Sequence, residues 1–373
     1  MFSTMPKGRI FTLDILRGYF LLVILTDHLY RFPNLLQFFT GRGQLWVSAA
    51  EGFFMISGLL VGFIYRPKIS RGFKKIFRKL WRRAAKLYVI SVSLTLLFTL
   101  WGQFLPADKI KSGIWPGGNL VQLLYKTATF QYVYGWADFL VFYAVFMFFA
   151  PIALWLIAKF NGWVVMVLSV LVWYFFRLQS EHAAWQLLFM SGLLVGGNLL
   201  AIEEKFSALA SRHKKLAGAI LSGVTLLTII LSIYFVFGFG RILPPENVFN
   251  FLAPLVDKNT VGPLRFILAW IWFAALYLLV RFRENQIDRV TGGIIRTLGQ
   301  DSLLVYSLEA ILLYPVNFLP STGFAGSSVV TLAAFAVVYL SVLGKKAFLS
   351  KKLPVNNCLS GAEAKMEGLF PES

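Results

Sequence analysis

The first long apolar segment of the chain, residues 10–31, contains the side chains best suited to chemistry: Asp14, Arg17, Asp27 and His28. Ionisable groups are costly in hydrocarbon, so inside a membrane span they indicate a functional site by default. Arg17 and His28 are eleven residues apart. A helix would therefore project both side chains from one face, about 16 Å apart along its axis. This spacing makes His28 a candidate general base and Arg17 a cation on the same face.

Glu51 is the third member of this candidate site. It lies a little over one turn into the second apolar segment, at a depth near that of His28. A carboxylate beside an imidazole fixes its tautomer and stabilises its protonated form, as a general base requires. Other roles remain open: Arg17 can snorkel to the inner headgroups, Asp14 can be its ion-pair partner or a helix N-terminal carboxylate, and His28 can be a boundary histidine. Three aligned groups nevertheless favour a site.

A basic segment at residues 66–86 has ten Lys and Arg and no acid. It could hold the phosphates of an anionic cytosolic donor, and the candidate donor-binding residues are Arg17, Arg82, Arg83 and Lys86. Contact with anionic lipid, together with the charge bias that orients membrane proteins, explains the same cations. The two roles are compatible.

Aromatic residues and a carboxylate meet in the segment that contains Trp136 and Asp138, and Trp115 lies in a nearby turn. Aromatic faces beside a carboxylate are suited to stacking and hydrogen bonding with a carbohydrate, so these three residues are candidates for binding an acceptor. An aromatic belt at the outer membrane boundary is the alternative interpretation.

The remaining ionisable residues have simpler explanations. Asp301 is placed to cap a helix, whereas Glu309, about two turns further along, has no such explanation. His182 lies in a short outer loop and His213 in a solvated inner loop. Because the three histidines are dispersed and the carboxylates are not clustered, we expect no metal site and no permanently bound cofactor.

The elements that position these residues are predicted from composition. Of 373 residues, 58% are hydrophobic and only 14% charged, whereas soluble domains average about 45–50% and about 25%. A soluble enzyme, a disordered protein and a disulfide scaffold are therefore excluded, the last also because Cys358 is the single cysteine. About ten stretches are long enough to span the hydrocarbon. They are residues 10–31, 46–65, 87–105, 132–158, 162–177, 185–202, 216–240, 263–280, 298–319 and 325–344.

The charge distribution orients this all-α, polytopic bundle. With a cytoplasmic N-terminus, 26 of the 36 Lys and Arg lie in inner segments, 9 in outer segments, and Arg17 lies within the membrane. This asymmetry follows the positive-inside rule, so the net charge of +19 requires no nucleic-acid partner. We predict a cytoplasmic N-terminus at 1–9, a membrane domain at 10–345, and a polar, disordered cytoplasmic tail at 346–373, all in the bacterial inner membrane.

One hexapeptide occurs twice: SGLLVG at residues 57–62 and again at 191–196, each time in a span predicted to run from outside to inside. Small residues four apart allow two helices to approach closely. We interpret the repeat as a packing face, and a duplicated half-molecule is the alternative.

Four motifs resemble the OpgC-like branch of the integral-membrane acyltransferase-3 superfamily. They are LDILRG at 13–18 followed by Asp27-His28, AAEGFFMISG at 49–58, WQLLF at 185–189 and LGQDSL at 298–303. Members of this branch succinylate osmoregulated periplasmic glucans. The resemblance implies that His28 is the catalytic histidine, Arg17 the essential arginine and Glu51 a partner. Many members of the superfamily have a histidine where this chain has Glu309, so no second catalytic histidine is expected.

We therefore expect an O-acyltransferase that moves a succinyl or acetyl group from a cytosolic acyl-CoA to a hydroxyl of an extracytoplasmic glycan. His28, polarised by Glu51 or Asp27, acts as general base or as acyl carrier. The main alternative is a transporter or flippase for glycans or lipid-linked sugars, with the intramembrane charges as its pathway. An inactive scaffold, which would retain its function in His28→Ala and Arg17→Ala variants, is the third possibility.

Overall fold

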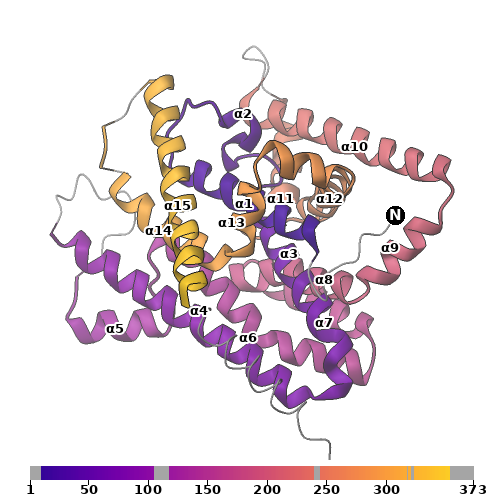
Figure 1. The fold of residues 1–373 in the computed structure, drawn as a ribbon, viewed down its shortest axis with the longest axis horizontal. Helices are drawn as coiled ribbons and strands as arrows, with labels where there is room; N and C mark the ends of the chain where they lie inside the picture. The colour runs from indigo at the N-terminus through magenta and orange to yellow at the C-terminus, as the bar shows by residue number, and fades with distance from the viewer. Residues whose placement is uncertain (1–9, 105–116, 239–243, 317, 321–322, 353–373) are drawn as a thin grey trace, which may run out of the picture.

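The computed structural model describes residues 10–104, 117–238, 244–316, 318–320 and 323–352, and within these ranges all regular secondary structure is helical (Figure 1). The predicted N-terminal segment at 1–9, and residues 353–373 of the tail predicted at 346–373, lie outside the described residues. The longer helices are α1 Phe11–His28, α3 Ala49–Tyr65, α4 Phe73–Gly102, α6 Asp138–Lys159, α7 Gly162–Phe176, α8 Glu181–Gly197, α10 Ser211–Phe237, α12 Pro263–Val290, α14 Ser302–Val316 and α15 Phe324–Lys352. The shorter ones are α2 Gln37–Thr40, α5 Leu120–Ala128, α9 Leu199–Ala208, α11 Glu246–Val256 and α13 Ile294–Gln300.

A helix occupies each of the ten predicted stretches, and six helices of the described chain are long and apolar enough to cross a membrane. The six are Ala49–Ser70, Phe73–Gly102, Gly135–Lys159, Ser211–Phe237, Pro263–Val290 and Phe324–Leu349. The pair α8 and α9, bent by 61°, would make a seventh. The other stretches hold shorter apolar helices, α7 and α14, or the charged helix α1. The chain is thus an all-helical membrane protein.

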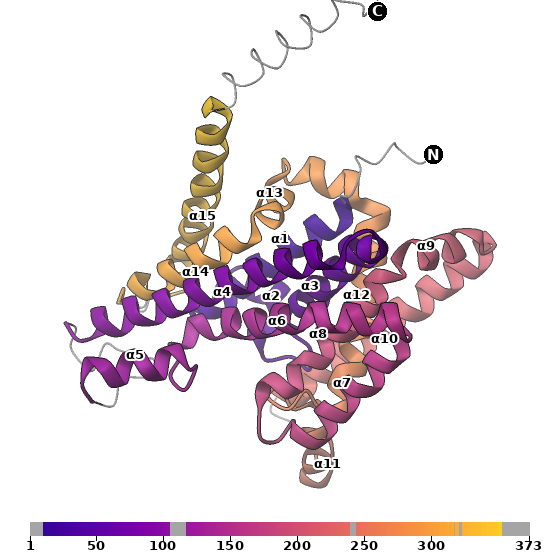
Figure 2. The ribbon, with the colours of Figure 1, turned by 90° about the horizontal axis from the view of Figure 1, so that it is seen from below.

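Helix α1 lies at the centre of the molecule in both views (Figures 1 and 2) and contacts α3, α12, α13 and α14. Buried apolar residues lie on every side of it, among them Leu13, Ile15, Leu16 and Leu21. Burial all round is typical of a helix in the core of a bundle. The candidate residues on α1 are therefore enclosed by protein rather than by lipid.

Glycines bring α1 and α13 into close backbone contact. A Cβ atom on Gly18 would overlap the carbonyl oxygen of Ile295, and one on Gly299 would overlap that of Asp14. Only glycine permits this approach, because any larger residue would separate the two backbones. This contact fixes the N-terminal half of α1, which carries Arg17, against α13, directly before α14 begins.

The repeated hexapeptide forms the interface between α3 and α8. A Cβ atom on any of its four glycines would overlap a backbone carbonyl oxygen of the facing helix; the pairs are Gly58 with Phe189, Gly62 with Leu193, Gly192 with Met55 and Gly196 with Leu59. Residue numbers rise together along both helices, so α3 and α8 run parallel. The interpretation of the repeat as a packing face is confirmed, and so is the prediction that both segments run in the same direction.

The last helix is longer than the sequence indicated. We place the end of the membrane domain at residue 345, but α15 continues to Lys352, and its C-terminal end projects beyond the other helices (Figure 2). The side chain of Lys345 forms an ion pair with Asp301, and that of Lys346 donates to Gln300 at 3.3 Å. These contacts tie the polar end of α15 to the junction of α13 and α14. Asp301, expected to cap a helix, is instead the partner of a lysine.

Candidate active site

A cavity of about 390 Å³ lies at the C-terminal end of α1, and both Asp27 and His28 line it. Four further charged residues line the same cavity: Arg42, Asp138, Glu181 and Lys258. Aromatic rings from α3, α6 and α8 complete its wall, with Phe54, Phe142 and Trp185 among them. An aromatic and charged concave site around a histidine can bind a polar substrate and exchange a proton with it.

The loop after α1 is firmly held, which fixes the position of His28. Tyr30, at φ +50°, turns the chain out of the helix, a conformation that is uncommon for residues other than glycine. The buried guanidinium of Arg31 then donates to three carbonyl oxygens at the end of α14, those of Val316, Leu319 and Pro320. The carboxamide oxygen of Asn34 accepts from the backbone N–H groups of Leu36 and Gln37, at 2.8 and 2.9 Å.

Asp27 is buried, and its Oδ1 has no hydrogen-bond partner among the described residues. Gly43, at φ +66°, passes over it so closely that a Cβ atom there would lie 3.2 Å from Oδ2. A buried acceptor without a partner is costly, so Asp27 is available to a donor that enters the cavity. It is adjacent to His28 in sequence and shares the cavity with it.

Two helix N-termini supply the other carboxylates. Asp138 begins α6, and its Oδ1 accepts from the N–H of Phe139. Glu181 begins α8. Carboxylates are favoured at helix N-termini by the positive end of the helix dipole. The ring of His182, next to Glu181, stacks on Phe142 at 4.2 Å between centroids, so this histidine packs beside the cavity instead of standing free in a loop.

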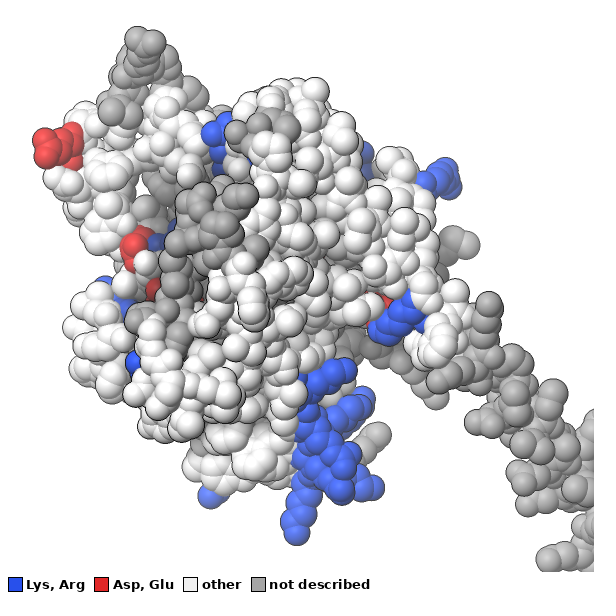
Figure 3. Space-filling view, turned by 90° about the vertical axis from the view of Figure 1, so that its left-hand side faces the viewer, with Lys and Arg blue, Asp and Glu red and all other residues white. Residues whose placement is uncertain are grey.

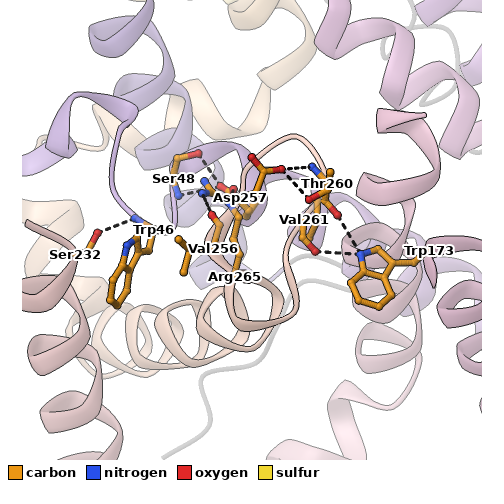
Figure 4. Close-up of polar contacts among 10 residues, drawn as sticks. Trp46, Ser48, Trp173, Ser232, Val256, Asp257, Thr260, Val261 and Arg265 are labelled. Carbon is orange, nitrogen blue, oxygen red and sulfur yellow. Dashed lines mark hydrogen bonds and ion pairs between the residues drawn. The ribbon is translucent and has the colours of Figure 1, made fainter. Parts of the chain in front are cut away.

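Glu51 is fully buried, and its described bonds join it to Ser48 and Arg265 (Figure 4). Its Oε2 accepts from the N–H and Oγ of Ser48 at 2.9 and 2.6 Å, which completes a capping box at the start of α3. Its Oε1 accepts from Nε of Arg265, and Nη1 of that arginine donates to the carbonyl oxygen of Val256. None of these bonds reaches His28. Glu51 therefore holds α3 and α12 in place at the edge of the site.

Arg17 lies at the other end of α1, and its Nη2 donates to Ser302 Oγ at the start of α14. Asp14 is buried in the first turn of α1. With α1 continuous from Phe11 to His28, Arg17 is about 16 Å from His28 along the helix axis. The distance between Arg17 and the cavity along α1 is therefore the one that the sequence spacing predicts.

The basic segment spans the short 3-10 helix Arg66–Arg71 and the first turns of α4, which packs against α6. Lys and Arg side chains gather in a projecting group at the lower edge of the face in Figure 3. Arg82 and Lys86 are exposed, whereas Arg83 is partly buried and donates to Tyr143 Oη of α6 at 2.7 Å. The three predicted donor-binding residues on α4 therefore differ: two remain available to a ligand and one is bound to a neighbouring helix.

Of the predicted acceptor-binding residues, the structure brings only Asp138 to the cavity wall. Trp136 lies beside Tyr134, with ring centroids 5.5 Å apart, and its carbonyl oxygen accepts from Tyr306. Trp115 lies outside the described residues. Trp185, the first residue of the motif WQLLF, is the tryptophan that lines the cavity.

Sequence reasoning missed Lys258 and Asn259, which line the cavity from the loop between α11 and α12. Both residues share this cavity with Asp27, His28 and Asp138. In the sequence this lysine was one of nine outer cations. The signal was the polar run Asp257-Lys258-Asn259-Thr260 between two apolar segments, followed by Gly262-Pro263, a composition typical of an ordered turn.

Glu309 of α14 is 2% exposed, and neither carboxyl oxygen has a hydrogen-bond partner among the described residues. Tyr306, one turn earlier, stacks on Phe139 of the cavity wall at 5.1 Å between ring centroids. Glu309 thus remains a buried ionisable residue without a structural explanation.

Comparison with known proteins identifies the family. The sequence model of the family described as OpgC protein matches residues 9–353. No curated protein and no solved structure matched the chain. The match covers every described helix, including the cavity at the end of α1 and the loops around it. The chain therefore belongs to the OpgC protein family.

Proposed function

We propose that the chain is a membrane O-acyltransferase that moves a succinyl or acetyl group from a cytosolic acyl-CoA to a hydroxyl of an extracytoplasmic glycan. Membership of the OpgC family supports acyl transfer. The observation that carries the proposal for this chain is His28 in a cavity of about 390 Å³ with acidic, basic and aromatic walls.

In the proposed reaction His28 takes the proton of the acceptor hydroxyl, and the hydroxyl oxygen attacks the thioester carbonyl carbon. The carbon–sulfur bond breaks, an ester bond forms, and the proton held by His28 passes to the sulfur of the leaving thiol. A positioned base contributes about 10²–10⁴-fold to such a step. A route through an acyl-histidine uses the same residues.

The cavity residues support distinct roles. Asp27 lines the same cavity as His28 and has an acceptor atom without a partner among the described residues. We assign to it the carboxylate role in the reaction, in which it accepts from a donor that enters the cavity beside His28. Glu51 is a positioning residue, because its bonds with Ser48 and Arg265 hold α3 and α12. Asp138 and the ring of Trp185 form the wall suited to a sugar, through hydrogen bonding and stacking.

The topology that supports this reaction has ten spans with both termini in the cytoplasm of the bacterial inner membrane. The first turns of α4, with Arg82 and Lys86 exposed, then face the cytoplasm and attract the donor phosphates. Arg17 lies on the same side, and His28 faces the outer side where the glycan arrives. The transferred acyl group crosses along α1 between these two residues.

The test is transfer from radiolabelled succinyl-CoA and acetyl-CoA to a neutral glucan by purified protein in vesicles. Wild type is compared with His28→Ala and with the control His213→Ala, since His213 is exposed on the opposite side of the proposed membrane topology. Labelled ester is expected with wild type and His213→Ala and is expected to be lost with His28→Ala. Movement of labelled glycan across the vesicle membrane without ester formation would favour the transporter alternative and overturn this proposal.

A further inference from the structure

The loop between α11 and α12 is anchored on both sides of Lys258 (Figure 4). Oδ2 of Asp257 accepts from the N–H and Oγ1 of Thr260, at 2.8 and 2.7 Å. Nε1 of Trp173 on α7 donates to the carbonyl oxygens of Thr260 and Val261, at 3.2 and 3.0 Å. The backbone that carries Lys258 and Asn259 is thus fixed within itself and against a second helix.

The backbone conformation adds to this constraint. Val261 is fully buried at φ +47°, a region that β-branched residues rarely adopt. Gly262 packs so closely that a Cβ atom would overlap the carbonyl oxygen of Leu255. Backbone held in a rare conformation at the rim of a cavity is characteristic of functional loops. The loop therefore presents residues 258 and 259 to the cavity in a defined position.

Two cations line the cavity, and they differ in their partners. The guanidinium of Arg42 donates to Gln37 Oε1 at 2.6 and 3.1 Å and lies over the ring of Phe32. In the described part of the chain, no hydrogen bond or ion pair engages the ammonium of Lys258, which is exposed to the cavity. Lys258 is the cation available to a ligand.

The charges of the cavity indicate which ligand needs this lysine. Asp27, Asp138 and Glu181 make the wall acidic, so a neutral acyl group such as acetyl needs no cation there. An acyl group with its own carboxylate would be repelled unless a positive charge binds it. The carboxamide of Asn259 is beside the lysine in sequence and lines the same cavity. It offers a second donor to a carboxylate.

Building on the proposed transfer at His28, we propose that Lys258 binds the terminal carboxylate of a dicarboxylic acyl group and thereby selects it over a monocarboxylic one. The thioester carbonyl would lie at His28 and the far end of the acyl chain at the loop between α11 and α12. Lys258 is then a specificity-determining residue, which takes no proton from the acceptor.

The experiment compares succinyl-CoA with acetyl-CoA as donors to a neutral glucan, so that no charge on the acceptor contributes. The variants are Lys258→Met, which keeps the length of the side chain without its charge, and Lys258→Arg, which keeps the charge. Lys205→Met, at an exposed position on α9, is the matched control. Thermal unfolding and gel filtration in detergent check the fold of each variant.

Lys258→Met is expected to lower kcat/KM for succinyl-CoA about 10- to 100-fold, the usual effect of losing a hydrogen bond to a charged group. Its activity with acetyl-CoA is expected to change less than twofold, and Lys258→Arg is expected to restore part of the succinyl preference. An equal loss with both donors, or an unchanged ratio of the two, would overturn the assignment of Lys258 while leaving acyl transfer intact. Absence of transfer by wild type from either donor would instead overturn the proposed function, and this inference with it.

Discussion

The carboxylate of Glu51 is bonded to the guanidinium of Arg265, 214 residues further along the chain, at 2.5 Å, and both side chains are almost completely buried. One end of this pair is the first turn of α3, and the other is the first turn of α12. The pair therefore joins α3 and α12. The segments at the starts of these helices, 43–50 and 256–262, contribute residues to the cavity around His28.

Removal of one member of this pair is expected to destabilise the protein strongly. Arg265→Leu leaves the carboxylate of Glu51 buried with only Ser48 as a partner, and breaking a buried pair in this way costs about 3–5 kcal/mol. The double variant Glu51→Leu/Arg265→Leu leaves no uncompensated charge, so it is expected to unfold at a higher temperature than Arg265→Leu alone. Thermal unfolding in detergent measures both. If the double variant unfolds at the same temperature as Arg265→Leu, or at a lower one, the two side chains are not coupled.

This pair shows where sequence reasoning reached its limit. Glu51 was recognised as unusual because an acid in an apolar, glycine-containing segment is costly, but the cation that pairs with it lies on the ninth α-helix after α3. Periodicity and local spacing do not report such contacts. The expected contact between Glu51 and His28 was based on their similar depth in the membrane. Two residues at the same depth can still lie on different sides of the bundle.

The features that could be predicted depend on local sequence. Each of the ten predicted apolar stretches contains a helix, and Arg17 and His28 lie on one continuous helix as their spacing indicated. The repeated hexapeptide predicted a face for close helix packing, which the structure shows between α3 and α8. The cavity could not be predicted, because Asp138, Lys258 and Trp185 meet His28 only through the packing of separate helices. Lys258 in particular resembled any outer cation until its loop was placed.

Close packing of α3 on α8 can be tested with alanine. Alanine is about 0.5–1 kcal/mol better than glycine inside a helix, so Gly218→Ala in α10, where a Cβ atom meets nothing within 4 Å, is expected to be neutral or stabilising. Gly58→Ala and Gly192→Ala introduce a Cβ atom that overlaps a backbone carbonyl oxygen. They are expected to destabilise by about 1–3 kcal/mol or more, as overpacking does. Unfolding temperatures unchanged at all three positions would contradict the described interface.

Arg17 is expected to depend on its planar guanidinium as well as on its charge. Arg17→Lys keeps the charge but replaces the rigid fork of N–H donors with a single ammonium. The hydrogen bond to Ser302 Oγ is then lost, and the other N–H donors of the guanidinium are no longer held in fixed positions. We expect kcat/KM for the acyl-CoA donor to fall about tenfold or more, the usual range for a hydrogen bond to a charged group. Ser302→Ala, which removes one acceptor, is expected to have a smaller effect. Wild-type kinetics in Arg17→Lys would exclude a role in donor binding.

The exposed cations of α4 are expected to act through long-range attraction of the donor. Arg82→Gln and Lys86→Gln are expected to raise KM for acyl-CoA a few-fold each with little change in kcat, because they weaken encounter with an anion and leave the cavity at His28 unaltered. Their effect is expected to shrink at high salt, where exposed charges are screened over about 10 Å or less. Arg83→Gln removes the bond to Tyr143, so a loss of thermal stability is expected in addition. The control is Arg212→Gln, at an exposed position in the charged first turn of α10. If the α4 variants have the same KM as this control, the basic segment serves only lipid contact and orientation.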